Sequence, residues 1–236
     1  MTELLYQRDS YLQRFSATVV GIDQQRRALA LDRTAFYPGG GGQPCDLGML
    51  GGLAVERVSR DADTIWHILA AGQLPEEGDR VQGRIDWDRR YLLMRTHSAL
   101  HVLCGVVWRR LRAKVTGGNM SPGEGRLDFE LEGLNRGLVE ELESECNREI
   151  AAARPIEVRF LPRQELEKFP DLIRTKVDLL PASVTEIRIV EIVDLDTQAD
   201  GGTHVAATSE IGGIAIPRYK SKGALNKRLY VSITSP

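Results

Sequence analysis

The sequence predicts an α+β protein in two parts: a glycine-rich, β-barrel-like domain over residues 1–85 and an α/β domain over residues 86–236. Two observations lead to this prediction. Short segments rich in β-branched and aromatic residues, separated by glycines or polar clusters, follow one another as far as residue 85. From Asp86 onward, helical periodicities alternate with further extended segments. A chain of 236 residues is long enough to bury a core in each part.

The N-terminal strands are predicted over the segments SATVVGID, ALALDRTAFYP, GGLAVERVSR, TIWHIL and RVQGRID. Short strands in succession are typical of a small antiparallel barrel or sandwich. His67 has no metal-ligating neighbour in its segment and is interpreted as a strand residue. The glycine run 39–42 is not a P-loop, because no Gly-Lys-Ser/Thr sequence follows it. By itself this run indicates a flexible turn.

Two helices are predicted in the second part. DWDRRYLLMRTHSALHVLCGVVWRRLRAKV has helical spacing from Leu93 to Leu111. GLNRGLVEELESECNREIAAA repeats an apolar position every four residues, at Leu138, Leu142, Cys146 and Ile150. The segments PIEVRFLP, IRIVEIVD, IGGIAIPRYKSKG and NKRLYVSI predict strands. We therefore expect two layers, with the helices on one face of a mainly antiparallel sheet.

Composition excludes several classes of protein. A formal net charge of −2 provides no overall basic field, so a nucleic acid would have to be held by a local patch. The three cysteines show no CxxC spacing, which fits a reducing compartment. The charged N-terminus is not typical of a signal peptide, and no apolar run approaches the ~20 residues of a membrane span. We expect a cytoplasmic protein with no membrane segment.

Histidines suggest a metal site. His97 and His101 are four residues apart, so a helix presents both imidazoles on one face. A zincin would have Glu where this chain has Ser98, so the metalloprotease interpretation lacks its general base. In DGGTH, a glycine-rich turn can bring Asp200 and His204 to the same point, completing a nitrogen and oxygen shell suited to zinc. Cys104 lies about 10 Å along the helix from His97 and is expected to belong to the core.

Five segments, in this order along the chain, carry a family resemblance. They are LDRTAFYPGGGGQPCDLGML, IDWDRRYLLMRTHSALHVL, GNMSPGEGRLDFEL, DGGTHVAATSEIG and YKSKGALNKRLYVSI. Together they resemble the AlaX family of alanyl-tRNA editing proteins, whose module also occurs in alanyl-tRNA synthetase and has a relative in threonyl-tRNA synthetase. The length resembles the medium form, a barrel plus a two-layer α/β editing domain. That form has no oligomerisation extension, which favours a monomer.

The resemblance implies hydrolysis of the ester that joins a wrong amino acid, chiefly serine, to tRNA(Ala). It implies one zinc ion per chain, held by His97, His101, Asp200 and His204. Zinc would either polarise the attacking water or anchor the amino group of the substrate, and the sequence leaves both roles open. The family usually has Cys at the position of Asp200. A carboxylate is also a zinc ligand, so we expect the metal to be retained; the alternative is a weakened or empty site.

The same resemblance assigns substrate contacts in the N-terminal part. Thr34 matches the position that reads the hydroxyl of serine, although its residue type alone indicates an ordinary strand residue. The glycine run would lie beside the substrate together with Gln43, which offers amide hydrogen bonds. The implied substrate-binding residues are Thr34, Gly40, Gly41, Gly42 and Gln43. The implied catalytic residues are Thr34, Gln43, His97 and His101.

Two basic clusters are candidates for binding the phosphates of the tRNA. The first comprises Arg109, Arg110, Arg112 and Lys114. The second, which belongs to a matched segment and is preferred, comprises Lys220, Lys222, Lys227 and Arg228. The turn SKGAL is expected to bring the second set together across a hairpin. Two other functions stay open: a zinc hydrolase of a small ester or amide, and a non-catalytic tRNA-binding module with a decayed metal site.

Overall fold

A computed structural model describes residues 2–168 and 185–234. These residues form two α-helices and mainly antiparallel sheets, so the predicted α+β class is confirmed. The chain divides into two compact units, Met1–Leu92 and Leu93–Pro236. The division falls inside the first helix, a few residues beyond the change in sequence pattern at Asp86.

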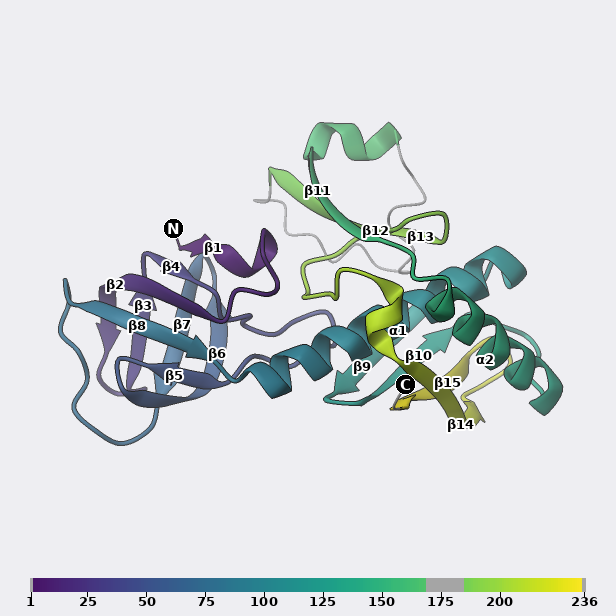
Figure 1. The fold of residues 1–236 in the computed structure, drawn as a ribbon, viewed down its shortest axis with the longest axis horizontal. Helices are drawn as coiled ribbons and strands as arrows, with labels where there is room; N and C mark the ends of the chain where they lie inside the picture. Colours follow the sequence, from purple (N-terminus) through teal and green to yellow (C-terminus); the bar gives the residue numbers. More distant parts are fainter. Residues whose placement is uncertain (1, 169–184, 235–236) are drawn as a thin grey trace. The chain divides into compact units, whose positions relative to one another are not determined.

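In the N-terminal unit, six antiparallel strands close into a barrel in the order β2-β3-β7-β6-β5-β8 (Figure 1). Their bounds are β2 Arg14–Asp23, β3 Ala28–Leu31, β5 Gly48–Leu50, β6 Leu53–Asp61, β7 Thr64–Leu69 and β8 Arg80–Ile85. On β7 the side chains of Ile65, His67 and Leu69 are buried while their neighbours are half-buried, which is the period of two expected for a strand with one face in a core. The core also contains Val19, Leu29, Leu31 and Phe36.

The predicted strand ALALDRTAFYP is broken in the structure. Its first four residues form β3, and two later residues form the short strand β4, Arg33–Thr34. Strand β4 pairs in parallel with β1, Glu3–Leu4. A loop then carries the glycine run. Gly39, Gly40, Gly41 and Gly42 all have positive φ, between 57° and 132°, a conformation that side chains other than glycine rarely adopt.

A buried ion pair ties the end of this loop to the first turn of helix α1, Trp87–Leu111. Arg90 and Asp46 are both almost inaccessible, and Nε of Arg90 donates to Oδ1 of Asp46 at 2.9 Å. Arg90 also donates to the backbone oxygen of Ala35 at 2.6 Å, and the amide of Tyr37 donates to Oδ2 of Asp46 at 2.6 Å. The loop is therefore fixed at both ends by hydrogen bonds, which the sequence did not indicate.

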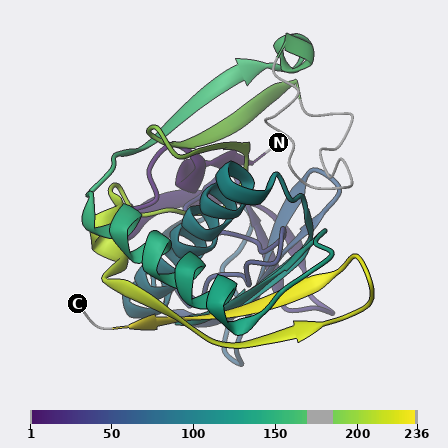
Figure 2. The same cartoon turned by 90° about the vertical axis from the view of Figure 1, so that its right-hand side faces the viewer.

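In the second unit, α1 and helix α2, Arg136–Ala151, pack on a four-stranded sheet in the order β14-β15-β10-β9 (Figure 2). The strands are β9 Val115–Ser121, β10 Glu124–Phe129, β14 Gly213–Ser221 and β15 Lys227–Thr234. Leu100 of α1 lies against Gly125, and Asn147 of α2 accepts from and donates to the backbone of Ile214. The sequence did not indicate β9 and β10, because glycines interrupt their pattern.

A second sheet of the same unit has the order β11-β12-β13, with β11 Ile156–Pro162, β12 Glu186–Ile192 and β13 Asp196–Ala199. Its turn before β13 approaches α1 at Gly105. A Cβ atom at this glycine would lie 2.9 Å from Cγ of Leu195 and 3.0 Å from Cβ of Asp196. Only glycine allows an approach this close, and it places β13 beside the helical histidines.

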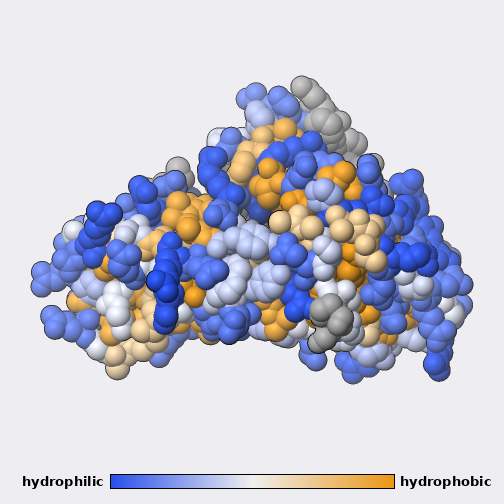
Figure 3. Space-filling view, viewed as in Figure 1, coloured by the Kyte–Doolittle hydropathy of each residue, from blue (hydrophilic) through white to orange (hydrophobic). Residues whose placement is uncertain are grey.

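Most of the surface visible in Figure 3 is hydrophilic, with separate hydrophobic patches between the charged side chains. Among the described residues, neither helix combines the length and the hydrophobicity that a membrane span requires.

Candidate metal centre

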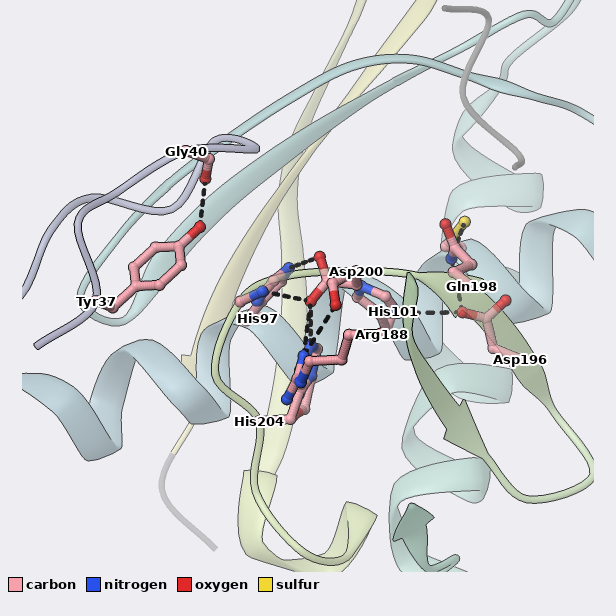
Figure 4. A network of polar contacts seen from close by, with 12 residues as sticks. Tyr37, Gly40, His97, His101, Arg188, Asp196, Gln198, Asp200 and His204 are labelled. Carbon is pink, nitrogen blue, oxygen red and sulfur yellow. Dashed lines mark hydrogen bonds and ion pairs between the residues drawn. The ribbon is translucent and has the colours of Figure 1, made fainter. Parts of the chain in front are cut away.

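Three histidines, two on α1 and one on the loop after β13, meet in the second unit. His97 and His101 are one turn apart on the buried side of α1, and their ring centroids are 5.0 Å apart. His204 follows β13 in the chain, and its ring centroid lies 4.3 Å from that of His97 and 4.7 Å from that of His101. The three imidazoles therefore surround one point (Figure 4).

Asp200 completes this group, because the turn DGGTH folds back on itself. Its Oδ2 accepts a hydrogen bond from the amide of Gly202 at 2.8 Å and lies 3.0 Å from Nε2 of His204. Its Oδ1 lies 3.6 Å from Nε2 of His97. One ligand atom from each of the four residues lies within 4.8 Å of all the others. The structure thus brings together the four residues that the sequence singled out.

The protonation states of this group suit a divalent cation. Burial lowers the pKa of His97 well below its usual value, and it lowers the pKa of His204 to about 4. Burial alone would raise the pKa of the Asp200 carboxyl, but the imidazoles around it, His97 first, hold this pKa well below its usual range. At neutral pH His97 and His204 therefore offer neutral imidazole nitrogens and Asp200 offers a carboxylate, the forms that ligate zinc.

Arg188 of β12 is a buried neighbour of this group that the sequence did not reveal. Its Nη1 donates to the backbone oxygen of Asp200 at 3.0 Å and lies 3.7 Å from the Oδ2 atom of the same residue. The guanidinium therefore holds the turn in place and offsets part of the carboxylate charge. No motif in the sequence links Arg188 to Asp200, because the two residues meet through the pairing of β12 with β13.

A carboxylate supports His101 from behind. Oδ2 of Asp196, which is 2% exposed, lies 3.2 Å from Nδ1 of His101 and accepts from Nε2 of Gln198 at 2.6 Å. The same Gln198 nitrogen lies 3.2 Å from Sγ of Cys104. Cys104 is buried, as expected of a core residue. Because Nδ1 of His101 faces Asp196, its Nε2 is the nitrogen that remains for a metal.

Ser98 supports His204 in a similar way. Its Oγ is buried, lies 3.1 Å from Nδ1 of His204 and accepts from the amide of Val205 at 3.2 Å. The residue that occupies the place of a zincin glutamate is thus a hydrogen-bonding support of the third histidine. By contrast, Nδ1 of His97 is buried with no hydrogen-bond partner among the described residues.

The other residues implied by the resemblance belong to the N-terminal unit. Thr34 is completely buried, with its Oγ1 2.8 Å from Nε2 of His67 and 3.1 Å from the amide of Phe36. Gln43 is also buried, and its backbone exchanges hydrogen bonds with that of Gly40. Gly40 and Gly41 are exposed, and the hydroxyl of Tyr37 donates to the oxygen of Gly40 at 2.9 Å.

The two basic clusters have different environments. Nη2 of Arg109, in the first cluster, lies 2.7 Å from Oε1 of Glu145 and 2.6 Å from Oε1 of Glu149, both on α2. Arg110 pairs with Glu141 of the same helix. These two arginines join the two helices. The second cluster lies on a β14–β15 hairpin, as expected, with Lys220 directly opposite Arg228.

Within the second cluster, Lys227 differs from the expectation of a surface residue. It is only 5% exposed, and its Nζ donates to the backbone oxygens of Gly223 and Ala224, both at 2.7 Å. Lys227 therefore closes the hairpin turn. Lys220 and Lys222 are exposed.

The exposed face of this sheet carries further basic residues that the sequence analysis did not single out. Arg126, Tyr230 and Arg218 stand in one cross-strand row, and Cζ of Arg218 lies 3.8 Å from the centroid of the tyrosine ring. The adjacent row on the same face contains Asp128, which accepts two hydrogen bonds from Arg228. Cationic side chains and an aromatic ring thus occur together on one face.

Comparisons with known proteins agree with these features. A family model described as the threonyl and alanyl tRNA synthetase second additional domain matches residues 187–230, and a model of class II (A) tRNA synthetases matches residues 11–89. The first model covers strands that position the metal group, by which we mean His97, His101, Asp200 and His204. The second model covers the barrel and the glycine run.

Full-length relatives match as well. The chain is 38% identical to the alanyl-tRNA editing protein AlaX-M of Saccharolobus solfataricus, over 99% of both chains. It is 34% identical to the alanyl-tRNA editing protein AlaX-L of Pyrococcus horikoshii, covering 94% of this chain and 55% of the relative. It is 38% identical to the alanine–tRNA ligase of Pyrobaculum aerophilum, covering 92% of this chain and 25% of the ligase. The chain therefore belongs to the AlaX family of alanyl-tRNA editing proteins, and its end-to-end match is with the AlaX-M form.

Proposed function

We propose that this protein is a deacylase that hydrolyses the ester of tRNA(Ala) carrying a wrong amino acid, chiefly serine. The observation that supports this most strongly is the buried group of His97, His101, Asp200 and His204 in a chain of the AlaX family. A small-ester hydrolase would need no tRNA contacts, whereas this chain matches editing proteins from end to end.

The proposed cofactor is one zinc ion per chain. Neutral imidazoles and a carboxylate are the donors that zinc takes, and the ligand atoms converge within 4.8 Å of one another. A bound zinc ion would supply Lewis-acid polarisation at the reaction centre. The carboxylate of Asp200, in place of the usual cysteine, adds an anionic oxygen ligand. Asp196 and Ser98 engage Nδ1 of His101 and of His204, so Nε2 of each ring would be the nitrogen that holds the zinc ion.

Selection between serine and alanine depends on one hydroxyl group. A site with a buried polar group that only serine satisfies can reject the analogue lacking this hydroxyl by up to ~10⁴–10⁵. We assign this role to Thr34, and we assign substrate contacts to Gly40, Gly41, Gly42 and Gln43. Thr34 is completely buried, and its hydroxyl oxygen already contacts Nε2 of His67 and the amide of Phe36, so these two contacts hold the hydroxyl in one position.

The tRNA is proposed to bind the basic face of the β14-β15-β10 sheet. Lys220 and Lys222 are exposed there and can contact phosphates, while Arg126 and Arg218 widen the cationic area. Tyr230 offers an aromatic surface beside them. Arg109 and Arg110 are weaker candidates, because two glutamates of α2 pair with each of them, whereas Nζ of Lys222 lies 3.6 Å from Oδ2 of Asp128 alone among the described ion pairs.

The decisive experiment measures deacylation of seryl-, glycyl- and alanyl-tRNA(Ala) by purified protein whose metal content is known. We expect fast hydrolysis of the seryl ester, slow hydrolysis of the alanyl ester and about one zinc ion per chain. Cleavage of small esters without deacylation of any tRNA would instead identify a small-ester hydrolase. Tight tRNA binding with neither metal nor turnover would identify a non-catalytic binding module.

A companion variant tests the assignment of Thr34. Thr34→Val keeps the shape of the side chain and removes its hydroxyl. We expect the activation free energy for hydrolysis of seryl-tRNA(Ala) to rise by about 1–3 kcal/mol, because a buried partner loses its hydrogen bond. An unchanged rate for the seryl ester would remove Thr34 from the mechanism.

A further inference from the structure

His67 is a buried histidine that the metal group does not use. It stands on β7 with 0% exposure and points into the barrel core between Ile65 and Leu69. Its backbone pairs with Leu29 of the neighbouring strand β3, and its ring packs edge-on against Phe36. Burying a polar ring in a hydrophobic core costs free energy unless both of its nitrogens form hydrogen bonds.

The hydrogen bond to Leu29 determines which nitrogen carries the proton. Nδ1 of His67 lies 3.1 Å from the backbone oxygen of Leu29. A carbonyl oxygen can only accept, so Nδ1 must be the N–H donor. Burial, opposed in part by this hydrogen bond, lowers the pKa of His67 to about 4. The ring is therefore neutral at pH 7, and Nε2 carries a lone pair and no proton.

This tautomer orients the hydroxyl of Thr34. Nε2 of His67 lies 2.8 Å from Oγ1 of Thr34, and because Nε2 is an acceptor, the threonine O–H must donate to it. The amide of Phe36 donates to the same oxygen at 3.1 Å. A hydroxyl has one proton and two lone pairs. Among the contacts of the described residues, the proton and one lone pair are used, which leaves Thr34 the capacity to accept one more hydrogen bond.

We infer that His67 is a positioning residue for specificity, which fixes the Thr34 hydroxyl as an acceptor so that the site selects amino acids whose side chain donates a hydrogen bond. This inference rests on the proposed function, in which Thr34 faces the side chain of the esterified amino acid. Serine donates through its hydroxyl and is selected. Alanine and glycine have no side-chain donor, and the remaining lone pair of Thr34 stays unsatisfied beside them.

The arrangement makes a prediction about a substrate of matched size. In 3-fluoroalanine, a fluorine atom replaces the serine hydroxyl, so the polar atom is kept and its proton is lost. Because Thr34 can only accept from the substrate, tRNA(Ala) acylated chemically with 3-fluoroalanine should be hydrolysed about as slowly as alanyl-tRNA(Ala). Hydrolysis at the rate of the seryl ester would overturn the requirement for a donor.

Variants of His67 test the positioning role itself. His67→Phe removes the acceptor for the Thr34 proton, and the ratio of kcat/KM for seryl- over glycyl-tRNA(Ala) should fall roughly tenfold, the scale of one hydrogen bond. His67→Gln places an amide oxygen near the position of Nε2 and should restore much of this ratio. In a Thr34→Val background, the His67→Phe change should leave the ratio unaltered. Equal loss on both esters, or additive effects of the two changes, would show that His67 supports only the fold.

A spectroscopic measurement on the wild-type protein tests the inference without measuring activity, so it does not rely on the proposed function. It also requires no variant of His67 that folds correctly. Long-range proton–nitrogen NMR of histidine-labelled wild-type protein reports which ring nitrogen of His67 carries the proton. We expect Nδ1–H at pH 7, and an Nε2–H tautomer would overturn the inference directly. If the tautomer is as expected but Thr34→Val leaves seryl-tRNA hydrolysis unchanged, the proposed role of Thr34 fails, while the hydrogen-bond arrangement stands.

Discussion

Oδ2 of Asp196 lies 3.2 Å from Nδ1 of His101, although the two residues are 95 positions apart in the chain. Both groups are buried, and the contact exists because Gly105 lets the turn before β13 lie directly on α1. A carboxylate that accepts from one nitrogen of a ligating histidine fixes the tautomer, orients the ring and makes the other nitrogen more basic. Asp196 is therefore expected to affect how tightly the proposed metal site binds an ion, through His101.

Replacing this carboxylate should weaken metal binding. Asp196→Asn keeps the size of the side chain and removes its charge, so zinc affinity should fall by about 10–100-fold, the range found for such outer partners. Competition with a chromophoric chelator measures the affinity. Asp194→Asn is a matched control, because its side chain is 83% exposed and lies two residues earlier. If both variants bound zinc equally well, Asp196 would have no role in positioning His101.

Metal content and its removal test the ligand group. Purified protein should contain about one equivalent of zinc, and stripping with a chelator should abolish deacylation, which added zinc then restores. Asp200→Cys should bind zinc more tightly, because thiolate is the softer ligand. Elemental analysis and chelator competition give the two readouts. Full activity in protein shown to be metal-free would contradict a metal-dependent reaction.

Salt dependence tests the proposed tRNA surface. Neutralising Lys220 and Lys222 together should weaken binding of correctly and wrongly charged tRNA(Ala) alike. The slope of log K against log salt should flatten by somewhat under one unit per lost phosphate contact. Cleavage of a minimal seryl-adenosine ester should not change. Arg57→Ala with Arg60→Ala removes the same charge from exposed positions of the barrel. A lysine double variant with wild-type affinity and slope would place the tRNA elsewhere.

The pH dependence of stability follows from the buried histidine of the barrel. The pKa of His67 is about 4 in the folded chain, compared with a usual value of 6.5. Between these values the unfolded chain binds more protons than the folded one. The contribution of neutral His67 to the free energy of unfolding is therefore complete above pH 6.5 and is lost as the pH falls towards 4. At about 1.4 kcal/mol per pKa unit, the loss approaches about 3 kcal/mol.

Comparison with a variant that cannot titrate isolates this effect from the other histidines. Denaturant unfolding of wild type and His67→Gln should give free energies of unfolding whose difference changes between pH 6.5 and 4, with the wild type losing more. The metal group is present in both proteins, so its own pH dependence cancels. Parallel curves over this interval would mean that His67 is not held neutral by burial.

Family membership, the α+β class and the four residues of the metal group could be read from the sequence. Each depends on a local signal: His97 and His101 share a helix face because the α-helix repeats every 3.6 residues, and Asp200 and His204 are joined by a short glycine-rich turn. The hairpin that pairs Lys220 with Arg228 was also expected, because its turn and strands are contiguous in sequence.

Only the tertiary structure decided which groups surround these residues. Arg188 contacts Asp200 through strand register, Asp196 contacts His101 through helix–sheet packing, and His67 of β7 contacts Thr34 of β4. Burial also distinguishes lysines that look alike in the sequence: Lys227 is buried and donates to the carbonyls of its own turn, whereas Lys220 is exposed. Spacing in the sequence reports contacts within one element. Contacts between elements depend on register and packing, which no single segment encodes.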